Sequence, residues 1–251
     1  MASVASLFIL TGASRGMGRA MASQLLARGG VQLLCISRRT DAALEAEAAR
    51  AGSQVVQWPL DLADPVPAAE RLGQWLQGLD GSGFAAATLI NNAGTVGDPA
   101  PLAQASLPAL SQALRVGLEA PLLLTAAFLG ATAGWAGRRQ VLNISSGLGR
   151  NAMGSQAPYC AAKAGMDHFS RAVALEAGGA RIVSLAPGVI DTDMQVQLRG
   201  TDAALFPDRG RFEKLKSEGL LDSPEAAARK VLAWLDRADF GEQPVADVRQ
   251  G

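Results

Sequence analysis

Short, nearly continuous apolar runs alternate with longer alanine-rich stretches along most of this chain. Strands that are apolar throughout, rather than at every second residue, are typical of a parallel sheet covered on both faces. The strand-like runs are Ser6–Leu10, Val31–Ile36, Gln54–Trp58, Ala86–Asn91, Gln140–Ser145, Ala180–Ala186 and Pro244–Val248. Helices are expected near 16–29, 41–51, 65–78, 106–134, 157–178 and 223–237. The alternation, without a break in composition, predicts an α/β fold in one doubly wound, Rossmann-type domain over residues 1–251.

Residues 187–222 interrupt this alternation. The segment is rich in proline, glycine, aspartate and other charged residues, and holds one short helical piece near Arg209–Glu218. Long connections of this kind in compact domains often act as lids or substrate loops. We therefore expect 187–222 to be a substrate loop or lid.

Charge and composition exclude several classes of function. The 251 residues include 23 basic and 23 acidic side chains, so nothing favours binding to nucleic acid or to an anionic membrane. One histidine and two cysteines do not supply a zinc site or a disulfide scaffold, and no metal is expected. The uncharged stretch 120–137 contains Pro121 and many small residues, which favours a buried helix over a membrane span. No basic residue precedes the apolar run near the N-terminus, so we expect no export signal and a cytoplasmic location.

A glycine-rich turn follows the first strand. Thr11-Gly12-Ala13-Ser14-Arg15-Gly16-Met17-Gly18 leads into a helical stretch. Glycines allow a sharp turn and close approach of a pyrophosphate, and the N-terminus of the helix attracts its charge. Its G-x-x-x-G-x-G spacing differs from the common G-x-G-x-x-G pattern, and an ordinary glycine-rich turn is the alternative. We predict that the turn binds a dinucleotide through Gly12, Ser14, Arg15, Gly16, Met17 and Gly18.

The end of the second strand indicates which dinucleotide is used. An acid usually stands there when NAD is preferred, because it binds the ribose 2′-hydroxyl. Here Ser37, Arg38 and Arg39 follow the strand, and the first acid is Asp41. Arginine pairs well with a phosphate, so Arg38 and Arg39, together with Arg15, predict NADPH (NADP⁺) as the cofactor. The alternative is that these arginines simply face solvent.

Tyr159 and Lys163 form the candidate catalytic pair. Four residues apart on a helix, they share one face. An ammonium beside a phenol favours the phenolate, and a phenol of lowered pKa can act as a general acid or base near neutral pH. Ser146 ends a predicted strand thirteen residues earlier and can hold a substrate oxygen. Tyr159 is the only tyrosine, and Lys163 is one of four lysines in a chain with nineteen arginines; an incidental pair on an amphipathic helix is the alternative.

Taken together, these motifs resemble those of the short-chain dehydrogenase/reductase family. The matching pieces are the turn at 11–18, Asp61-Leu62, Asn91-Asn92-Ala93-Gly94, Ser146, Tyr159 with Lys163, and Pro187-Gly188. The resemblance implies a seven-stranded parallel sheet, hydride transfer from a nicotinamide, and Ser146, Tyr159 and Lys163 as the catalytic residues. It further implies a cofactor site lined by Ser37, Asp61, Leu62, Asn91, Ala93, Gly94, Tyr159, Lys163, Pro187, Gly188, Val189, Thr192 and Met194. Asp61 would contact the adenine, and Thr192 the carboxamide of the nicotinamide.

The chain departs from the family at one position. An asparagine in the long fourth helix usually completes the catalytic set, and its main chain binds a water that relays protons to the lysine. The matching stretch here is Val116-Gly117-Leu118. Gly117 therefore stays outside the predicted set, and whether the helix deforms there is left open.

The second half of the chain resembles the sepiapterin reductase and bacterial benzil reductase group within the family. The similar stretches are 141–146, 186–195, 211–219 and 244–248. In sepiapterin reductases an aspartate near the C-terminus anchors the pterin, and Asp247 matches its position; the alternative is a surface acid at a strand end. Leu148, Met153 and Met194 are candidates for an apolar wall of the substrate pocket.

The sequence thus favours an NADPH-dependent reductase of a small ketone, such as a diketone or the side chain of a pterin. Tyr159 would donate the proton, Lys163 would lower its pKa and hold the ribose, and Ser146 would orient the carbonyl. Two alternatives remain open: an NADP(H)-binding regulator or sensor without turnover, and an NADP-dependent alcohol dehydrogenase working in the oxidative direction. The apolar helices 106–134 and 157–178 favour a homodimer or homotetramer.

Overall fold

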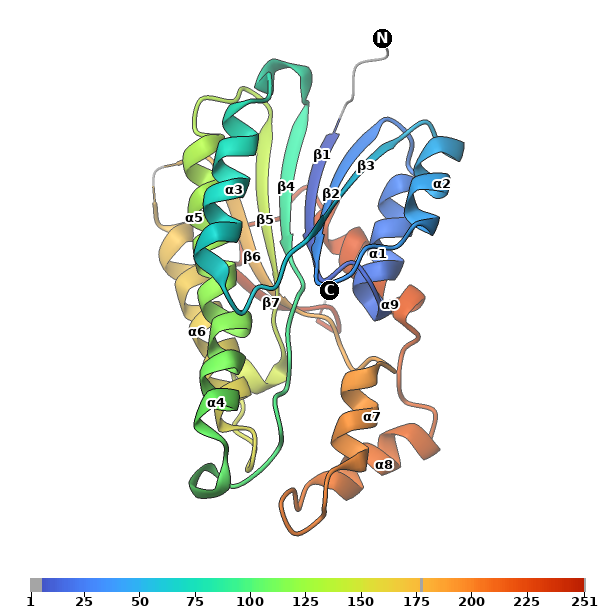
Figure 1. Ribbon diagram of the computed structural model, residues 1–251, viewed down its shortest axis with the longest axis vertical. Helices are drawn as coiled ribbons and strands as arrows, with labels where there is room; N and C mark the ends of the chain where they lie inside the picture. Colours follow the sequence, from blue (N-terminus) through green and yellow to red (C-terminus); the bar gives the residue numbers. More distant parts are fainter. Residues whose placement is uncertain (1–5, 177, 251) are drawn as a thin grey trace.

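A parallel sheet of seven strands runs through the centre of the computed structural model, which describes residues 6–176 and 178–250 (Figure 1). The strands are β1 (Ser6–Thr11), β2 (Val31–Ser37), β3 (Gln54–Pro59), β4 (Ala86–Asn91), β5 (Arg138–Ile144), β6 (Arg181–Ala186) and β7 (Val245–Asp247). Their order is β3-β2-β1-β4-β5-β6-β7, and every neighbouring pair is parallel. The predicted Rossmann-type fold is confirmed, with only small differences at the ends of the strands.

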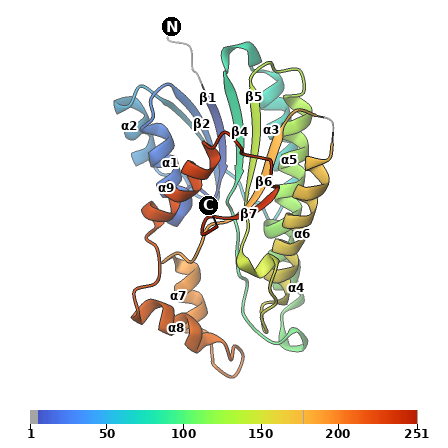
Figure 2. The same cartoon turned by 180° about the vertical axis from the view of Figure 1, so that it is seen from behind.

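Helices cover both faces of the sheet. Figures 1 and 2 show α1, α2 and α9 on one face and α3, α5 and α6 on the other. The helices are α1 (Gly16–Leu26), α2 (Ala43–Arg50), α3 (Pro65–Gln77), α4 (Leu107–Leu114), α5 (Ala120–Ala131), α6 (Ala157–Ala174), α7 (Asp193–Gly200), α8 (Arg209–Ser217) and α9 (Pro224–Leu235). All helical stretches predicted between the strands are present.

Successive side chains of a strand point to opposite faces, and here both directions end in apolar core. Leu10 of β1 belongs to the cluster with α1 and α9, whereas its neighbour Ile9 belongs to the cluster with α3 and α5. Both side chains are completely buried. This explains why the strands are apolar throughout.

The strand order places a crevice where the chain changes direction. From β1 the chain continues to β2 and β3 on one side, and then crosses to β4 on the other side of β1. In open α/β sheets, ligands bind at the carboxyl ends of the strands at such a switch point. The glycine-rich turn after β1 and the polar turn after β4 meet there.

The excursion at 187–222 forms a separate lobe beyond the carboxyl ends of the strands (Figure 1). Its two ends meet through a parallel bridge between Ile190 and Asp222, and the amide of Asp222 donates to the carbonyl of Val189 at 2.9 Å. The lobe contains the predicted helical piece as α8. It also contains α7, which the sequence did not predict.

The long helix predicted over 106–134 is continuous but not uniform. Its middle, Arg115–Glu119, is π-helical and joins α4 to α5. By length and composition alone Leu107–Ala131 is one candidate for a membrane span within the described chain. Its inner side is nevertheless part of the core, because Ala120, Leu124 and Phe128 are completely buried against α3 and the sheet.

Replacing Phe128 with alanine tests this core. Truncating a fully buried phenylalanine leaves a cavity and typically lowers the free energy of unfolding by about 3–5 kcal/mol. Chemical denaturation should show such a loss for Phe128→Ala. The control Leu175→Ala removes a side chain that is 89% exposed and should change the stability by less than about 0.5 kcal/mol. Equal effects of the two variants would contradict the packing described.

Candidate active site

Each of the three glycines in the turn after β1 is required for a physical reason, either its backbone conformation or the space around it. Gly12 and Gly16 adopt φ angles of +71° and +54°, in the left-handed region that glycine tolerates best. No residue larger than glycine fits at position 18, because a Cβ on Gly18 would lie 2.1 Å from the carbonyl oxygen of Gly12. The turn therefore brings the start of α1 directly onto the end of β1.

The N-terminus of α1 is suited to a phosphate group. Arg15 at the cap position is extended, and within the described chain no side chain caps α1 and no acid occupies its first turn. Free backbone N–H groups and the positive end of the helix dipole therefore face the crevice. The donors and the glycine turn fit the pyrophosphate of a dinucleotide.

Two residues that the sequence analysis did not assign hold this turn against β4. The Thr11 hydroxyl accepts hydrogen bonds from the amides of Asn92 and Ala93 at 2.9 and 3.0 Å. The Asn92 side chain donates to the carbonyl of Thr11 at 2.9 Å. Because Asn92 stands next to a predicted site residue in a polar turn, its position was the available signal. Gly94 follows on the same turn, at the edge of the crevice.

Asn91, by contrast, directs its side chain into the core. It is 1% exposed and donates to Asn143 Oδ1 at 2.8 Å and to Thr125 Oγ1 at 3.2 Å. The side chains of Met17 and Leu62 are likewise buried in the core clusters. These three predicted cofactor residues can meet a ligand only through their main chain.

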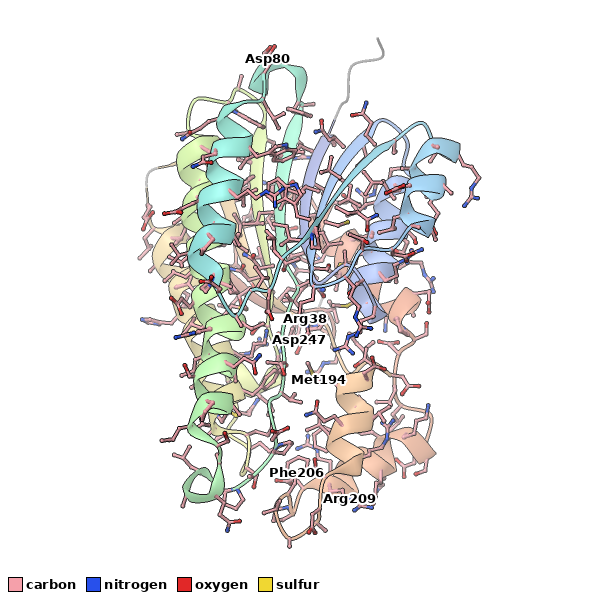
Figure 3. All side chains as sticks on the ribbon, viewed as in Figure 1. Arg38, Asp80, Met194, Phe206, Arg209 and Asp247 are labelled. Atoms are coloured by element: carbon pink, nitrogen blue, oxygen red, sulfur yellow. The ribbon has the colours of Figure 1, made fainter. Side chains whose placement is uncertain are left out.

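The ends of β2 and β3 present the predicted adenosine site. The Ser37 hydroxyl accepts a hydrogen bond from the amide of Ala13 at 2.8 Å and so braces the glycine-rich turn. Arg38 and Arg39 are exposed just beyond it, and Figure 3 shows Arg38 at the level where the strands end. Asp61 is exposed after β3 and accepts a hydrogen bond from the amide of Ala63.

Arg15 connects the glycine-rich turn to the excursion. Its guanidinium donates to Asp193, the first residue of α7, at 2.8 Å. The preceding residue, Thr192, lies over the turn, where its methyl group would be 3.5 Å from a Cβ at Gly16. The structure therefore brings Thr192 to the predicted cofactor site but pairs Arg15 with a carboxylate. Both partners are largely exposed, and exposed ion pairs contribute about 0–1 kcal/mol, so this pairing is easily exchanged.

Ser146, Tyr159 and Lys163 gather at the carboxyl ends of β4 and β5. Ser146 directly precedes the short helix η4 (Gly147–Gly149), and its hydroxyl accepts a hydrogen bond from the amide of Leu148 at 3.2 Å. The Lys163 ammonium donates to the carbonyl of Ile144 at 2.6 Å and lies 5.7 Å from the ring centre of Tyr159. A Cβ at Gly94 would be 3.8 Å from Lys163 Nζ, so the turn after β4 reaches the same point.

Burial sets the proton affinities of both groups. It raises the pKa of the Tyr159 phenol, and a hydrogen bond with Ser146 acts in the opposite direction. Burial lowers the pKa of Lys163 to about 8, while the nearby Asp167 carboxylate raises it. The sequence predicted that Lys163 lowers the pKa of Tyr159, but burial dominates here and the pKa of the phenol is raised. At neutral pH the phenol holds its proton and the lysine is mostly charged.

Gly117 lies in the π-helical segment, so the deformation left open by the sequence is present despite the missing asparagine. A Cβ at this buried glycine would lie 3.0 Å from the Cβ of Ala162, the neighbour of Lys163. Glycine therefore allows the long helix to approach α6 closely. Single π-helical turns of this kind often occur at functional sites.

An apolar wall faces Tyr159 from the excursion. Leu198, Phe206 and Phe212, together with Val96, form a small buried cluster, against which the predicted pocket residues Met153 and Met194 pack with Tyr159. Figure 3 shows Met194 and Phe206 beyond the carboxyl ends of the strands. The sequence analysis missed the phenylalanines, although two aromatic residues in a polar segment were a usable signal. Leu148, the third predicted wall residue, is half-buried beside Ser146.

The remaining predicted residues lie at the ends of β6 and β7. Gly188 adopts a φ of +87°, which turns the chain between Pro187 and Val189 into the excursion. Asp247 is 4% exposed and accepts two hydrogen bonds from the guanidinium of Arg249, at 2.8 and 2.6 Å. This guanidinium holds the pKa of the Asp247 carboxyl below its usual value. A substrate would have to share or displace Arg249 to reach it.

Comparisons with known proteins show which proteins the chain is similar to. A model of the short chain dehydrogenase family matches residues 6–203. A benzil reductase ((S)-benzoin forming) from Bacillus cereus is 35% identical over 241 residues, which cover 94% of this chain and 96% of that protein. A sepiapterin reductase from Meriones unguiculatus is 36% identical over 244 residues, which cover 92% of each chain.

Solved structures show the same fold. A short-chain dehydrogenase/reductase from Burkholderia vietnamiensis superposes with a TM-score of 0.68 at 35% identity and covers 98% of each chain. A metagenomic short-chain oxidoreductase, solved in complex with NADP, gives a TM-score of 0.68 at 26% identity over 94% of each chain.

Replacing Gly18 with alanine tests the close approach at the turn. The added methyl group overlaps backbone that cannot move aside, so Gly18→Ala should be unstable and should lose dinucleotide binding, as measured by thermal unfolding and fluorescence titration. Gly130→Ala is the matched control, because its Cβ meets nothing within 4 Å in the helix α5. That change should raise stability by about 0.5–1 kcal/mol. Tight binding by Gly18→Ala would show that the turn is not the dinucleotide site.

Proposed function

The chain belongs to the short-chain dehydrogenase family, and on that premise we propose that it reduces a small ketone to an alcohol with NADPH. The observation that carries the proposal is the placement of the half-buried Tyr159 phenol between Ser146 and the Lys163 ammonium. A ketone that gains a hydride develops negative charge on its oxygen, and that oxygen must receive a proton.

NADPH, when bound, supplies the hydride. Tyr159 then acts as the general acid, because burial keeps its proton on the oxygen until a stronger base appears nearby. The Ser146 hydroxyl orients the carbonyl and stabilises the developing negative charge. Lys163 supplies positive charge beside the phenol and would hold the ribose of the cofactor.

The preference for NADPH rests on the ends of β1 and β2. No acid follows β2 where a ribose 2′-hydroxyl would be bound, and the Ser37 hydroxyl is already used by the amide of Ala13. Arg38 and Arg39 are exposed beside it, which suits a 2′-phosphate. The solved NADP complex of a relative is consistent with this choice.

We propose an aromatic ketone or diketone as the substrate class. Met153, Met194 and the cluster around Phe206 offer an apolar wall beside Tyr159. Asp247 is engaged by Arg249, so a pterin would have to displace that pairing. One relative is named for the reduction of benzil, an aromatic diketone.

The alternatives are less well supported. A regulator without turnover was suggested by Gly117, yet the π-helical deformation is present around it. Alcohol oxidation is the reverse of the proposed reaction and uses the same residues; the exposed Arg38 and Arg39 favour NADPH and therefore favour reduction.

We also propose a cytoplasmic homo-oligomer. Leu107, Leu114 and Leu122 expose apolar surface along α4 and α5, which suits contact with another copy of the chain. Cys35 and Cys160 are free thiols on separate elements, as expected in a reducing compartment. Light scattering would contradict the oligomer if it found only monomers at micromolar concentration.

The central test is the variant Tyr159→Phe, assayed by NADPH oxidation with diketones, quinones, aldehydes and sepiapterin. Loss of the general acid should lower kcat by about 10²–10⁴-fold while NADPH binding stays near wild type. A panel in which the wild-type protein binds NADPH but reduces nothing would favour the regulator. Full activity in Tyr159→Phe would remove the phenol from the mechanism.

Cofactor preference is tested by Arg38→Ala and Arg39→Ala. Each should weaken NADPH binding by roughly tenfold, about 1.4 kcal/mol, and leave NADH binding unchanged, because only NADPH carries the 2′-phosphate. Arg50→Ala removes an exposed arginine from the far end of α2 and serves as the control. Tighter binding of NADH than NADPH by the wild-type protein would show that the arginines were misassigned.

A further inference from the structure

A carboxylate that the proposed reaction does not use lies buried behind the catalytic residues. Asp167 is 1% exposed and sits on α6, one helical turn beyond Lys163. Its Oδ1 accepts hydrogen bonds from the Ser145 hydroxyl at 2.5 Å and from the Ser184 hydroxyl at 2.7 Å. One oxygen atom therefore ties α6 to the end of β5 and to β6.

The tie to Ser145 matters because the next residue is Ser146. The amide of Ser145 also donates to the carbonyl of Leu185 at 2.8 Å, so this residue is held from two sides. Tyr159 and Lys163 belong to the helix that carries Asp167. Asp167 therefore links the segment that carries Ser146 to the helix that carries Tyr159 and Lys163.

The second oxygen of Asp167 faces the short helix after Ser146. Oδ2 accepts no hydrogen bond from the described residues and lies 3.7 Å from Nε of Arg150. A Cβ at Gly149 would approach it to 2.9 Å, which explains the glycine there. The carboxylate is thus packed between α6 and η4, close enough to act on the Lys163 ammonium through its charge.

Few other charges surround Lys163. Tyr159 stands beside it on α6, and Arg150 lies on the far side of Asp167. On the π-helical segment that packs against α6, both Arg115 and Glu119 are exposed. Among the described residues, Asp167 is the one carboxylate whose charge acts on the Lys163 ammonium.

We propose that Asp167 is a positioning residue for the carbonyl reduction, which pins Ser145 to α6 and places a carboxylate one helical turn from Lys163. Its catalytic consequence rests on the proposed function. Asparagine would accept the same two hydrogen bonds through Oδ1 without placing a charge in the core, where an ion is costly unless it is paired. The cations that a carboxylate serves at this position are Lys163, one helical turn away on α6, and Arg150, with Nε 3.7 Å from Oδ2.

The small number of lysines allows a direct test without turnover. The chain has four, at 163, 214, 216 and 230, so the side-chain signals of protein labelled with carbon-13 lysine can be followed by NMR across pH. In Asp167→Asn the titration midpoint of Lys163 should fall by about one pH unit, as expected when a nearby opposite charge is removed. The three other lysines should not move. The exposed-site control Asp236→Asn should leave all four midpoints unchanged.

The activity of Asp167→Asn should follow the same shift. Burial already lowers the pKa of Lys163 to about 8, so wild-type kcat should decline above that pH as the ammonium loses its proton. Without Asp167 the proton is lost at lower pH, and the decline should begin about one unit earlier with KM little changed. Ser145→Ala, which keeps the charge, should lower kcat roughly tenfold without moving the Lys163 midpoint.

An unchanged Lys163 midpoint in folded Asp167→Asn would overturn the proposal. If Asp167→Asn does not fold, Ser145→Ala provides the test. A kcat of Ser145→Ala equal to that of the wild-type protein would then contradict the proposal. Failure of the wild-type protein to reduce any ketone would overturn the proposed function instead. The NMR midpoint would still report on Asp167 in that case.

Discussion

The burial of one ammonium group organises the catalytic end of this fold. Lys163 is 4% exposed, and an ion in that position is costly unless groups of opposite polarity surround it. The carbonyl of Ile144 supplies one such group at the end of β5, and Asp167 supplies a negative charge from the next turn of α6. Because these two partners lie on β5 and α6, the lysine is stable only while that strand and that helix stay in register.

Elements of the fold also approach one another closely around the crevice, at positions where only glycine fits. Glycine stands where β1 meets α1, at Gly18, and where the long helix meets α6, at Gly117. A third, Gly149, lets η4 settle against Asp167. A side chain at any of these positions would therefore collide with a neighbouring element: the turn after β1 for Gly18, and α6 for Gly117 and Gly149.

The fold could be predicted from sequence because the central strands had to be apolar on both faces, which leaves a recognisable pattern of apolar runs. The site was predicted where a motif fixes the role, as with Tyr159 and Lys163, but side-chain direction was not accessible. Asn91 and Asn92 are adjacent and chemically identical, yet only the structure shows that Asn91 enters the core while Asn92 braces the turn. Asp247 looked free because its partner, Arg249, lies two residues away in a tail without any motif. Asp167 carried no signal, since its donors Ser145 and Ser184 come from two different strands.

Burial acts in opposite ways on the two members of the catalytic pair. A reductase needs an acid that keeps its proton until the ketone oxygen becomes basic, and burial of Tyr159 provides that. It also needs a positive charge that persists beside the phenol, although the same burial works against Lys163. Burial thus favours the protonated form of Tyr159 and disfavours the charged form of Lys163. The buried Asp167 carboxylate opposes this effect on Lys163, because its negative charge stabilises the ammonium.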